Sequence, residues 1–158
     1  MLKTGDEYLE SLRDGRRVFV GNEEVKDVTK HEAFRNAAHS FAMIYDMKAN
    51  SENRDVMSFE EDGDRFSSYF LMPKTQDDLV KRMETHRRIA EWSHGLLGRS
   101  PDHVSSFVTG LAMKPEMFEK IGQGFGANIV NYYKYMRAND IFACYTVLPP
   151  QGARKPEL

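Results

Sequence analysis

Apolar residues recur at intervals of three and four along much of this sequence, which is the spacing of one face of an α-helix. One regular stripe covers residues 34–45, and Thr29 with Glu32 before it forms a capping-box pattern. Further stripes that predict the packed faces of helices run from Leu79, Val80 and Met83 to Leu97, from Val104 and Phe107 to Ala112, and from Ile129 and Tyr132 to Met136. Helices are predicted over residues 4–15, 29–47, 75–97, 101–114 and 127–139, with a further one that opens at Pro115.

Segments rich in β-forming residues flank two turn signals, so two β-hairpins are predicted. Their strands are residues 17–20 with 24–28, and residues 56–59 with 66–71. A third β-rich segment, residues 141–147, predicts a strand that ends before Pro149 and has no evident partner. The polar residues 48–55 are expected to form a loop. Together these elements predict a mainly α fold with one or two small β-hairpins.

The composition is typical of one globular domain. At 158 residues the chain is long enough to bury a core, and its net charge of -2 arises from interspersed acidic and basic residues. This charge pattern does not favour a nucleic-acid partner. No stretch approaches the ~18 apolar residues of a membrane span, and no signal-peptide pattern is present, so we expect a cytoplasmic protein without membrane contact. Cys144 is the only cysteine, which rules out a disulfide within the chain.

Residues 98–103 predict a corner where one helix ends and the next begins. The left-handed residue, the N-cap, the first helical residue and the first-turn carboxylate are expected to be Gly98, Ser100, Pro101 and Asp102. Arg99 and His103 are not required by this turn, yet together they could face one anionic or phenolic oxygen. The alternative is that Arg99 pairs with a nearby carboxylate and that His103 is solvated.

Three other patterns have simpler explanations than a binding site. The acidic turn at residues 61–64 lacks the ligand ladder of a calcium loop, so a solvated turn is favoured. The glycines of residues 122–126 follow no strand and lack dinucleotide-loop spacing, which favours a helix break with close packing. His86 and His94 have no histidine or carboxylate four residues later, and satisfied or half-exposed histidines are favoured over zinc ligands.

The sequence resembles the N-terminal helical domain of the 4-hydroxyphenylacetate 3-hydroxylase family, the oxygenase components of two-component flavin monooxygenases. The matching stretches are residues 4–16, 25–29, 33–37, 89–92 and 98–102, and the β-rich segment that leads to Pro149 and Pro150. The resemblance implies an acyl-CoA-dehydrogenase-like fold. Residues 1–148 are then the helical N-terminal domain with its hairpins, and residues 149–158 lead toward a β-domain. In this family a C-terminal bundle follows and the subunits form homo-oligomers.

The resemblance also implies an activity. A separate flavin reductase supplies reduced FAD, and the oxygenase uses O2 to hydroxylate a phenol such as 4-hydroxyphenylacetate ortho to its hydroxyl group. The implied phenol-binding residues are those of the corner: Arg99, Ser100, Pro101, Asp102 and His103. A histidine before the proline pair usually completes the catalytic set with Arg99 and His103, and Cys144 is expected in its place. The implied flavin-lining residues are Cys144, Tyr145, Thr146, Pro150 and Gln151.

Two of the three polar positions differ from the usual residues of this family, because His103 stands for a tyrosine and Cys144 for a histidine. Histidine keeps a hydrogen-bonding group, whereas a thiol is a weak donor unless it is ionised. One alternative is therefore a binding or assembly module that keeps the scaffold without turnover. The 4-hydroxybutyryl-CoA dehydratases share this fold but bind an iron-sulfur cluster through cysteines near the corner, where this chain has none.

Overall fold

The computed structural model describes residues 2–97 and 100–145. The predicted fold class is confirmed, because most described elements are helices and the strands form two small hairpins. The helices are α1 (Gly5–Ser11), α2 (Arg35–Ala49), α3 (Ser51–Met57), α4 (Gln76–Trp92), α5 (Asp102–Ala112), α6 (Pro115–Glu119) and α7 (Phe125–Ala138). The other elements are β1 (Val18–Val20), β2 (Glu23–Val25), β3 (Ser58–Glu61), β4 (Asp64–Ser67) and the short 3-10 helix η1 (Ser68–Phe70).

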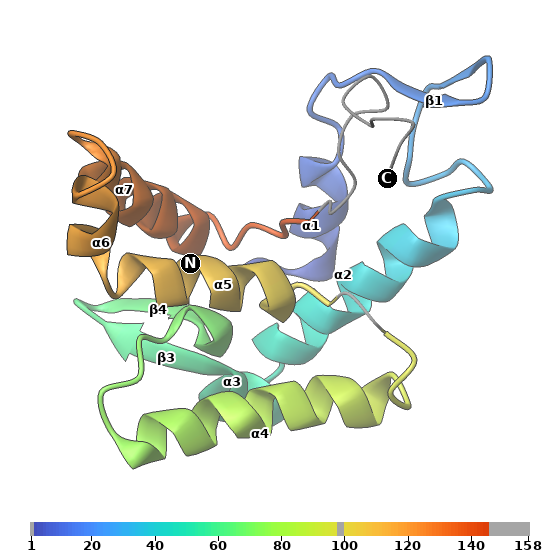
Figure 1. The fold of residues 1–158 in the computed structure, drawn as a ribbon. Coiled ribbons are helices and arrows are strands. Elements are labelled where there is room, and N and C mark those ends of the chain that lie inside the picture. The colour runs from blue at the N-terminus through green and yellow to red at the C-terminus, as the bar shows by residue number, and fades with distance from the viewer. Residues whose placement is uncertain (1, 98–99, 146–158) are drawn as a thin grey trace, which may run out of the picture.

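Both predicted hairpins form, and they occupy different environments. β1 and β2 are antiparallel, with Val18 opposite Val25, and this hairpin projects beyond α1 and α2 away from the main body (Figure 1). β3 and β4 are also antiparallel, with Phe59 opposite Phe66, and they lead directly into η1. η1 packs against α3, α4 and α5. The segment that follows the second hairpin therefore lies among the helices.

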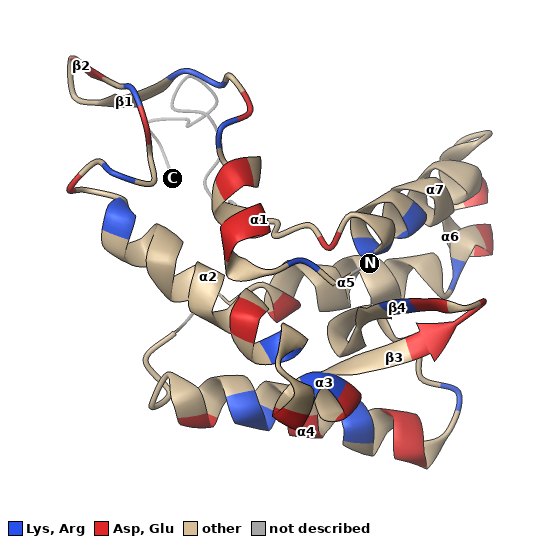
Figure 2. Ribbon diagram, turned by 180° about the vertical axis from the view of Figure 1, so that it is seen from behind, with Lys and Arg blue, Asp and Glu red and all other residues tan. Residues whose placement is uncertain are grey.

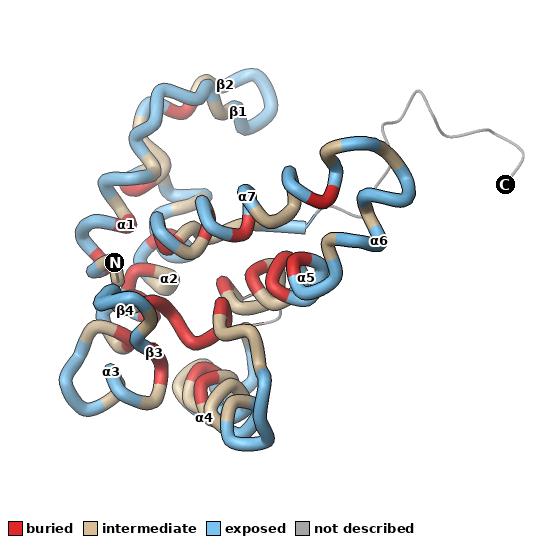
Figure 3. Tube along the Cα trace, turned by 90° about the vertical axis from the view of Figure 1, so that its left-hand side faces the viewer, coloured by how far each residue is buried: buried red, intermediate tan, exposed pale blue. Residues whose placement is uncertain are grey.

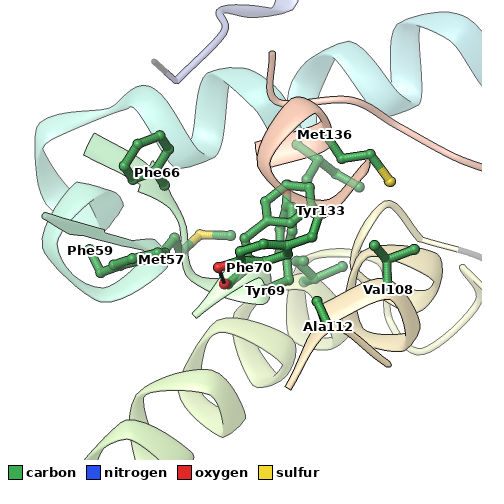
Figure 4. Packing of buried hydrophobic residues seen from close by; sticks show 11 residues of the cluster. Met57, Phe59, Phe66, Tyr69, Phe70, Val108, Ala112, Tyr133 and Met136 are labelled. Atoms are coloured by element: carbon green, nitrogen blue, oxygen red, sulfur yellow. Dashed lines mark hydrogen bonds between the residues drawn. The ribbon is translucent and has the colours of Figure 1, made fainter. Parts of the chain in front are cut away.

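The main hydrophobic core lies where η1 meets α5 and α7. Phe70 is completely buried and its ring lies against the rings of Tyr69 and Tyr133, as Figure 4 shows. The Tyr133 hydroxyl donates a 2.7 Å hydrogen bond to the backbone oxygen of Phe70. Buried positions accordingly concentrate around η1 and the inner side of α5, whereas the β1 and β2 hairpin is mostly exposed (Figure 3).

A buried polar cluster joins distant parts of the chain next to this core. The Lys48 ammonium lies 2.6 Å from Oδ2 of Asp140 and donates to the Tyr69 hydroxyl at 2.9 Å. The Ser67 hydroxyl donates to Oδ1 of Asp140 at 2.6 Å, and the backbone N–H of Lys3 donates to Oδ2 at 3.1 Å. The Lys48 and Asp140 side chains are only 0% and 2% exposed. We call these residues, Lys48, Ser67, Tyr69 and Asp140, the Asp140 cluster.

Two of the predicted helix boundaries are wrong near α2. The helix begins at Arg35 rather than Thr29, because the Thr29 hydroxyl donates to Asp27 and accepts from Arg13 instead of capping a helix. The predicted loop at residues 48–55 is mostly helical. α2 continues to Ala49, and Asn50 then caps α3 by accepting a hydrogen bond from the backbone N–H of Glu52.

α4 begins as predicted but ends early. Thr75 and Asp78 form a reciprocal capping box at its N-terminus. Its C-terminus is a Schellman motif in which His94 has a positive φ of 52° and the Gly95 N–H bonds to the Ala90 oxygen at 2.8 Å. Gly95 therefore follows the left-handed residue that ends this helix, and the predicted end near residue 97 is wrong.

The apolar stripe expected to bury α4 is also wrong in part. Leu79, Val80 and Met83 are exposed, while Thr85 and Ile89 face the core. Polar contacts decide this orientation: Arg82 donates to the backbone oxygens of Tyr69 and Leu71 and to the Ser106 hydroxyl. Tyr132 of α7, predicted to be buried, is likewise exposed.

The C-terminal helical region agrees with prediction, but the final strand does not. Pro115 is the first helical residue of α6, and Gly124 has a positive φ of 82° before α7. A Cβ at Gly126 would lie 2.7 Å from the Pro115 carbonyl oxygen, which confirms close packing at the glycine-rich break. Residues 141–145 form no strand, because Phe142 packs on the rings of Tyr8 and Phe41 rather than joining a sheet. Residues 146 and 147 lie outside the described part.

Charged residues of both signs are dispersed over the helices and strands (Figure 2). Among the helices of the described residues, none is long and apolar enough to cross a membrane.

We expect the stability of this fold to decrease steeply at alkaline pH. Burial raises the pKa of Tyr8 to about 12 and raises the pKa values of Tyr45 and Tyr69 well above the usual value. Unfolded tyrosines ionise near pH ~10, so the stabilisation is present below that pH and is lost as the pH rises toward the folded pKa values. Tyr8→Phe should make the fall shallower by up to about 1.4 kcal/mol per pH unit.

Denaturant unfolding of the parent and the Tyr8→Phe variant between pH 9 and 11, a window around the tyrosine reference of about 10, measures this slope. Tyr132→Phe, which removes an exposed phenol, is the matched control. Identical slopes for the parent and Tyr8→Phe would contradict the prediction.

Candidate active site

The N-terminus of α5 positions the described part of the predicted corner. Pro101 adopts helical dihedral angles immediately before α5, and the His103 N–H donates to the Ser100 backbone oxygen at 3.1 Å. The Ser100 side chain bonds to the Asp102 carboxylate rather than to a backbone N–H. The predicted N-cap is thus displaced by one residue, to Pro101. Arg99, the other polar residue of the corner, lies outside the described residues.

A shallow, open cavity of about 420 Å³ adjoins this helix end. Its lining residues come from α4 and α5 and are His86, Asp102, His103, Ser106 and Phe107. The cavity combines one carboxylate, two imidazoles and a hydroxyl with the apolar face of one phenyl ring. Such a mixture of an apolar wall and a few convergent polar groups is the usual composition of a small-molecule site.

Tyr145 joins this cavity's aromatic side. The Phe107 ring lies 5.2 Å from the His103 ring in an edge-to-face arrangement and 6.1 Å from the Tyr145 ring in a stacked one, measured between centroids. The His103 and Tyr145 centroids are 6.5 Å apart. Phe107 and Tyr145 are nevertheless 57% and 55% exposed. They therefore present aromatic surface next to an imidazole, on which a further ring can pack.

A turn at Asp140 precedes the segment that carries Tyr145. Asp140 follows α7 with a positive φ of 44°, and the Ile141 N–H bonds back to the Met136 oxygen at 3.0 Å. This turn directs residues 141–145 away from the axis of α7. Tyr145 meets His103, and Cys144 is exposed.

His86 and Asp102 form the closest polar contact across the cavity. Nδ1 of His86 lies 2.6 Å from Oδ2 of Asp102. Burial alone would raise the pKa of the Asp102 carboxyl, but the contacts with His86 and Ser100 hold the pKa below its usual value. Asp102 is consequently an anion at neutral pH that lies beside the imidazole, although the buried Nδ1 of His86 has no hydrogen-bond geometry to any partner among the described residues.

The structure thus brings together Ser100, Pro101, Asp102 and His103 of the predicted site, with Tyr145 against His103. Thr146, Pro150 and Gln151, predicted to line a flavin, lie outside the described residues, as does Arg99. Three cavity residues, His86, Ser106 and Phe107, are not part of the site predicted from the sequence. Phe107 is expected on the buried face of its helix by its spacing, but it is 57% exposed, so this prediction is wrong. His86 is expected to be satisfied or half-exposed; its side chain is 36% exposed, and its Nδ1 has no hydrogen-bond partner among the described residues although Asp102 lies 2.6 Å away. No sequence signal links His86 to Asp102, because α4 and α5 meet only in the folded chain.

Among residues 2–97 and 100–145, no group of three or more histidine, cysteine, aspartate or glutamate side chains is arranged to hold a metal ion.

Comparison with known proteins places this geometry in a family. Residues 4–158 match the family described as 4-hydroxyphenylacetate 3-hydroxylase N terminal. The chain is 34% identical over 155 residues to the 4-hydroxyphenylacetate 3-monooxygenase oxygenase component of Thermus thermophilus, covering 98% of this chain and 31% of that protein. It is 36% identical over 160 residues to the oxygenase component of a Rhodococcus 4-nitrophenol 2-monooxygenase, covering 97% and 30%.

The solved structures agree with the sequence matches. The oxygenase component (HpaB) of 4-hydroxyphenylacetate 3-monooxygenase, complexed with FAD and 4-hydroxyphenylacetate, superposes with a TM-score of 0.88 at 34% identity, over 98% of this chain and 32% of that one. The chain therefore spans about three tenths of the length of the relatives it matches. With its helical fold, corner and matched sequence, this chain belongs to the 4-hydroxyphenylacetate 3-hydroxylase N-terminal family.

Proposed function

We propose that this chain forms the phenol-binding part of a flavin-dependent aromatic hydroxylase that uses reduced FAD and O2. The observation that carries the proposal is the cavity at the start of α5, where His103 lies beside Phe107 and Tyr145. An aromatic substrate packs on the exposed rings, and its hydroxyl group reaches the polar side of the cavity. Relatives that share this part of the fold act on 4-hydroxyphenylacetate and 4-nitrophenol, as their names state, and both substrates are phenols.

The volume of the cavity supports the binding of an aromatic ring. A cavity of about 420 Å³ lies within the usual range of about 300 to 1,000 Å³ for small-molecule sites. It is shallow and open because Phe107 and Tyr145 remain more than half exposed. Segments beyond this chain are therefore needed to enclose the substrate, in keeping with a chain that spans three tenths of its relatives.

The described residues also fit one edge of a flavin site. Cys144 and Tyr145 are exposed on the segment that leads toward Thr146, Pro150 and Gln151, and the Tyr145 ring offers a flat face. When bound, reduced FAD supplies the oxygen activation. A flavin reductase partner is part of the proposal, because the relatives are oxygenase components. The homo-oligomer and the β-domain after residue 148 are proposed on the family resemblance.

In a chain extended past residue 158, Arg99→Ala is expected to weaken phenol binding by about 1.5 to 3 kcal/mol, the range for hydrogen bonds to charged groups. Arg99 stands four residues before His103 in the sequence, so its guanidinium can approach the same phenolic oxygen. Calorimetric titration with 4-hydroxyphenylacetate measures the change. Arg35→Ala, which removes an exposed arginine from the start of α2, is the matched control.

A titration with oxidised and reduced FAD, followed by absorbance, tests the flavin side in the same samples. Phenol binding by Arg99→Ala equal to that of the parent would reject the phenol assignment of Arg99. A chain that binds neither phenol nor FAD, alone or extended past residue 158, would favour the alternative of an assembly module.

A further inference from the structure

The wall of the cavity at the start of α5 contains a serine whose hydroxyl hydrogen is not used by its own helix. Ser106 lines the cavity. Two other hydroxyls of α5 donate to backbone oxygens four residues earlier, Ser105 to Pro101 at 2.9 Å and Thr109 to Ser105 at 2.7 Å. Among the described residues, Ser106 donates no such bond to the Asp102 backbone oxygen, and its oxygen is an acceptor instead. Its hydrogen is therefore available to a ligand.

The Ser106 oxygen accepts a hydrogen bond from a cation on the neighbouring helix. Nη2 of Arg82, on α4, donates to Oγ of Ser106 at 2.8 Å. Nη1 of the same guanidinium donates to the backbone oxygens of Tyr69 at 3.0 Å and Leu71 at 2.6 Å. A hydroxyl group has one hydrogen to donate, and that hydrogen points away from a donor that occupies its lone pair. Arg82 therefore holds the oxygen in place and leaves the hydrogen to the cavity side.

Arg82 also brings a positive charge to this wall. Its three acceptors are neutral oxygens, and it forms no ion pair with a carboxylate of the described residues. Burial lowers the pKa of the guanidinium, which nevertheless stays protonated at neutral pH. A hydroxyl group that accepts from a cation is polarised and becomes a stronger donor. The Ser106 hydroxyl is consequently suited to an electron-rich acceptor such as a phenolic oxygen.

The position of Ser106 on α5 fits a ligand that packs on the exposed rings. His103 precedes Ser106 by three residues, and residues at this spacing are neighbours on a helix surface. Phe107 follows directly and presents its ring to the same cavity. An oxygen bound near His103 can therefore reach the Ser106 hydroxyl while the aromatic ring of the ligand packs against Phe107.

We propose that Ser106 is a substrate-binding residue that donates a hydrogen bond to the phenolic oxygen of the ligand. Arg82 is the positioning residue, because it orients the serine without touching the ligand. The pair favours aromatic rings that carry a hydroxyl group, since an analogue without it leaves the polarised donor unpaired. This inference rests on the proposed function, because it requires a phenol in the cavity.

Two matched ligands test the role of Ser106. 4-Nitrophenol and nitrobenzene differ only in the phenolic hydroxyl group, and equilibrium dialysis measures the affinity for each. In a chain extended past residue 158, Ser106→Ala should lower the affinity for 4-nitrophenol about tenfold, the lower end of the range for hydrogen bonds to charged groups. The affinity for nitrobenzene should stay the same, because this ligand offers Ser106 no phenolic oxygen.

Ser40→Ala is the matched control, since it removes a hydroxyl group from the interior of α2 that donates to the Asn36 backbone oxygen. It should leave both affinities unchanged. Circular dichroism establishes that the variants are folded. Equal losses for the two ligands in Ser106→Ala, or no loss for either, would overturn the role of Ser106 and leave the proposed function intact. A parent that binds 4-nitrophenol no more tightly than nitrobenzene would overturn both.

A double-variant cycle tests whether Arg82 acts through the serine. Arg82→Gln should lower the affinity for 4-nitrophenol about threefold or more in the parent, but by less than about twofold in Ser106→Ala. Arg82→Lys, which keeps the charge and a donor, should retain part of the affinity that Arg82→Gln loses. Equal losses from Arg82→Gln in the two backgrounds would mean that Arg82 only supports the fold, and its positioning role would be rejected.

Discussion

Asp140→Ala is expected to destabilise the folded chain by about 3 to 5 kcal/mol, the cost of leaving a buried charge without its partner. The Lys48 side chain is completely buried, and Asp140 is the carboxylate that lies 2.6 Å from its ammonium. Burial lowers the pKa of Lys48, and Asp140 counteracts this effect. The variant also removes the acceptor for Ser67 and for the Lys3 backbone. Urea unfolding at neutral pH measures the loss.

Two further variants separate the ion pair from other effects of the substitution. Asp77→Ala, at an exposed first-turn position of α4, is the matched control and should cost no more than about 1 kcal/mol. The double variant Lys48→Met with Asp140→Leu replaces the pair with apolar side chains and should recover most of the loss, because such replacements are often neutral. A loss below about 1 kcal/mol for Asp140→Ala would mean that Lys48 reaches solvent or releases its proton at little cost.

Phe70→Ala should produce a comparable loss of about 3 to 5 kcal/mol, the range for removing a buried aromatic ring from a core. Phe70 is completely buried, and its ring contacts those of Tyr69 and Tyr133 (Figure 4). These residues come from η1 and α7, so the cavity would lie at the junction of the main elements. The magnitude depends on how far α5 and α7 can close around it.

Thermal and denaturant unfolding of Phe70→Ala measure this loss, with Phe125→Ala as the matched control. Phe125 is half exposed at the start of α7, so the same change there removes much less buried area. Equal losses in the two variants would contradict the assignment of Phe70 to the centre of the core.

Sequence patterns correctly predicted the helix starts that depend only on neighbouring residues. The capping boxes of Thr4 and Thr75 and the first-turn Pro115 are examples, because each depends on residues within one turn. The helix start predicted at Thr29 is wrong because a distant contact decides the role of this residue. Its hydroxyl is used by Asp27 and by the distant Arg13, a tertiary contact that no capping pattern reveals. The strand predicted over the β-rich residues 141–145 is wrong for the same reason, since Phe142 packs against α1 and α2.

The site was predictable to the extent that it lies on one segment. The residues from Ser100 to His103 are adjacent in sequence, and the structure keeps them together at the start of α5. His86 joins them only because α4 packs beside α5, so the sequence could not pair it with Asp102. The position of Tyr145 against His103 depends on the turn at Asp140, whose positive φ is unusual for a residue other than glycine. Cys144, expected in the place of a histidine, is exposed there, and its catalytic role stays a prediction.

The Asp140 cluster has a consequence for the synthesis of this chain. Lys48 and Asp140 are separated by 92 residues, so Lys48 leaves the ribosome well before its partner is made. At about 5 to 20 residues per second, that interval is roughly 5 to 20 s. During it the Lys48 ammonium is more stable in water than inside a core without a counterion. The core around Lys48 is therefore expected to reach its final packing only after Asp140, which follows α7, has been made.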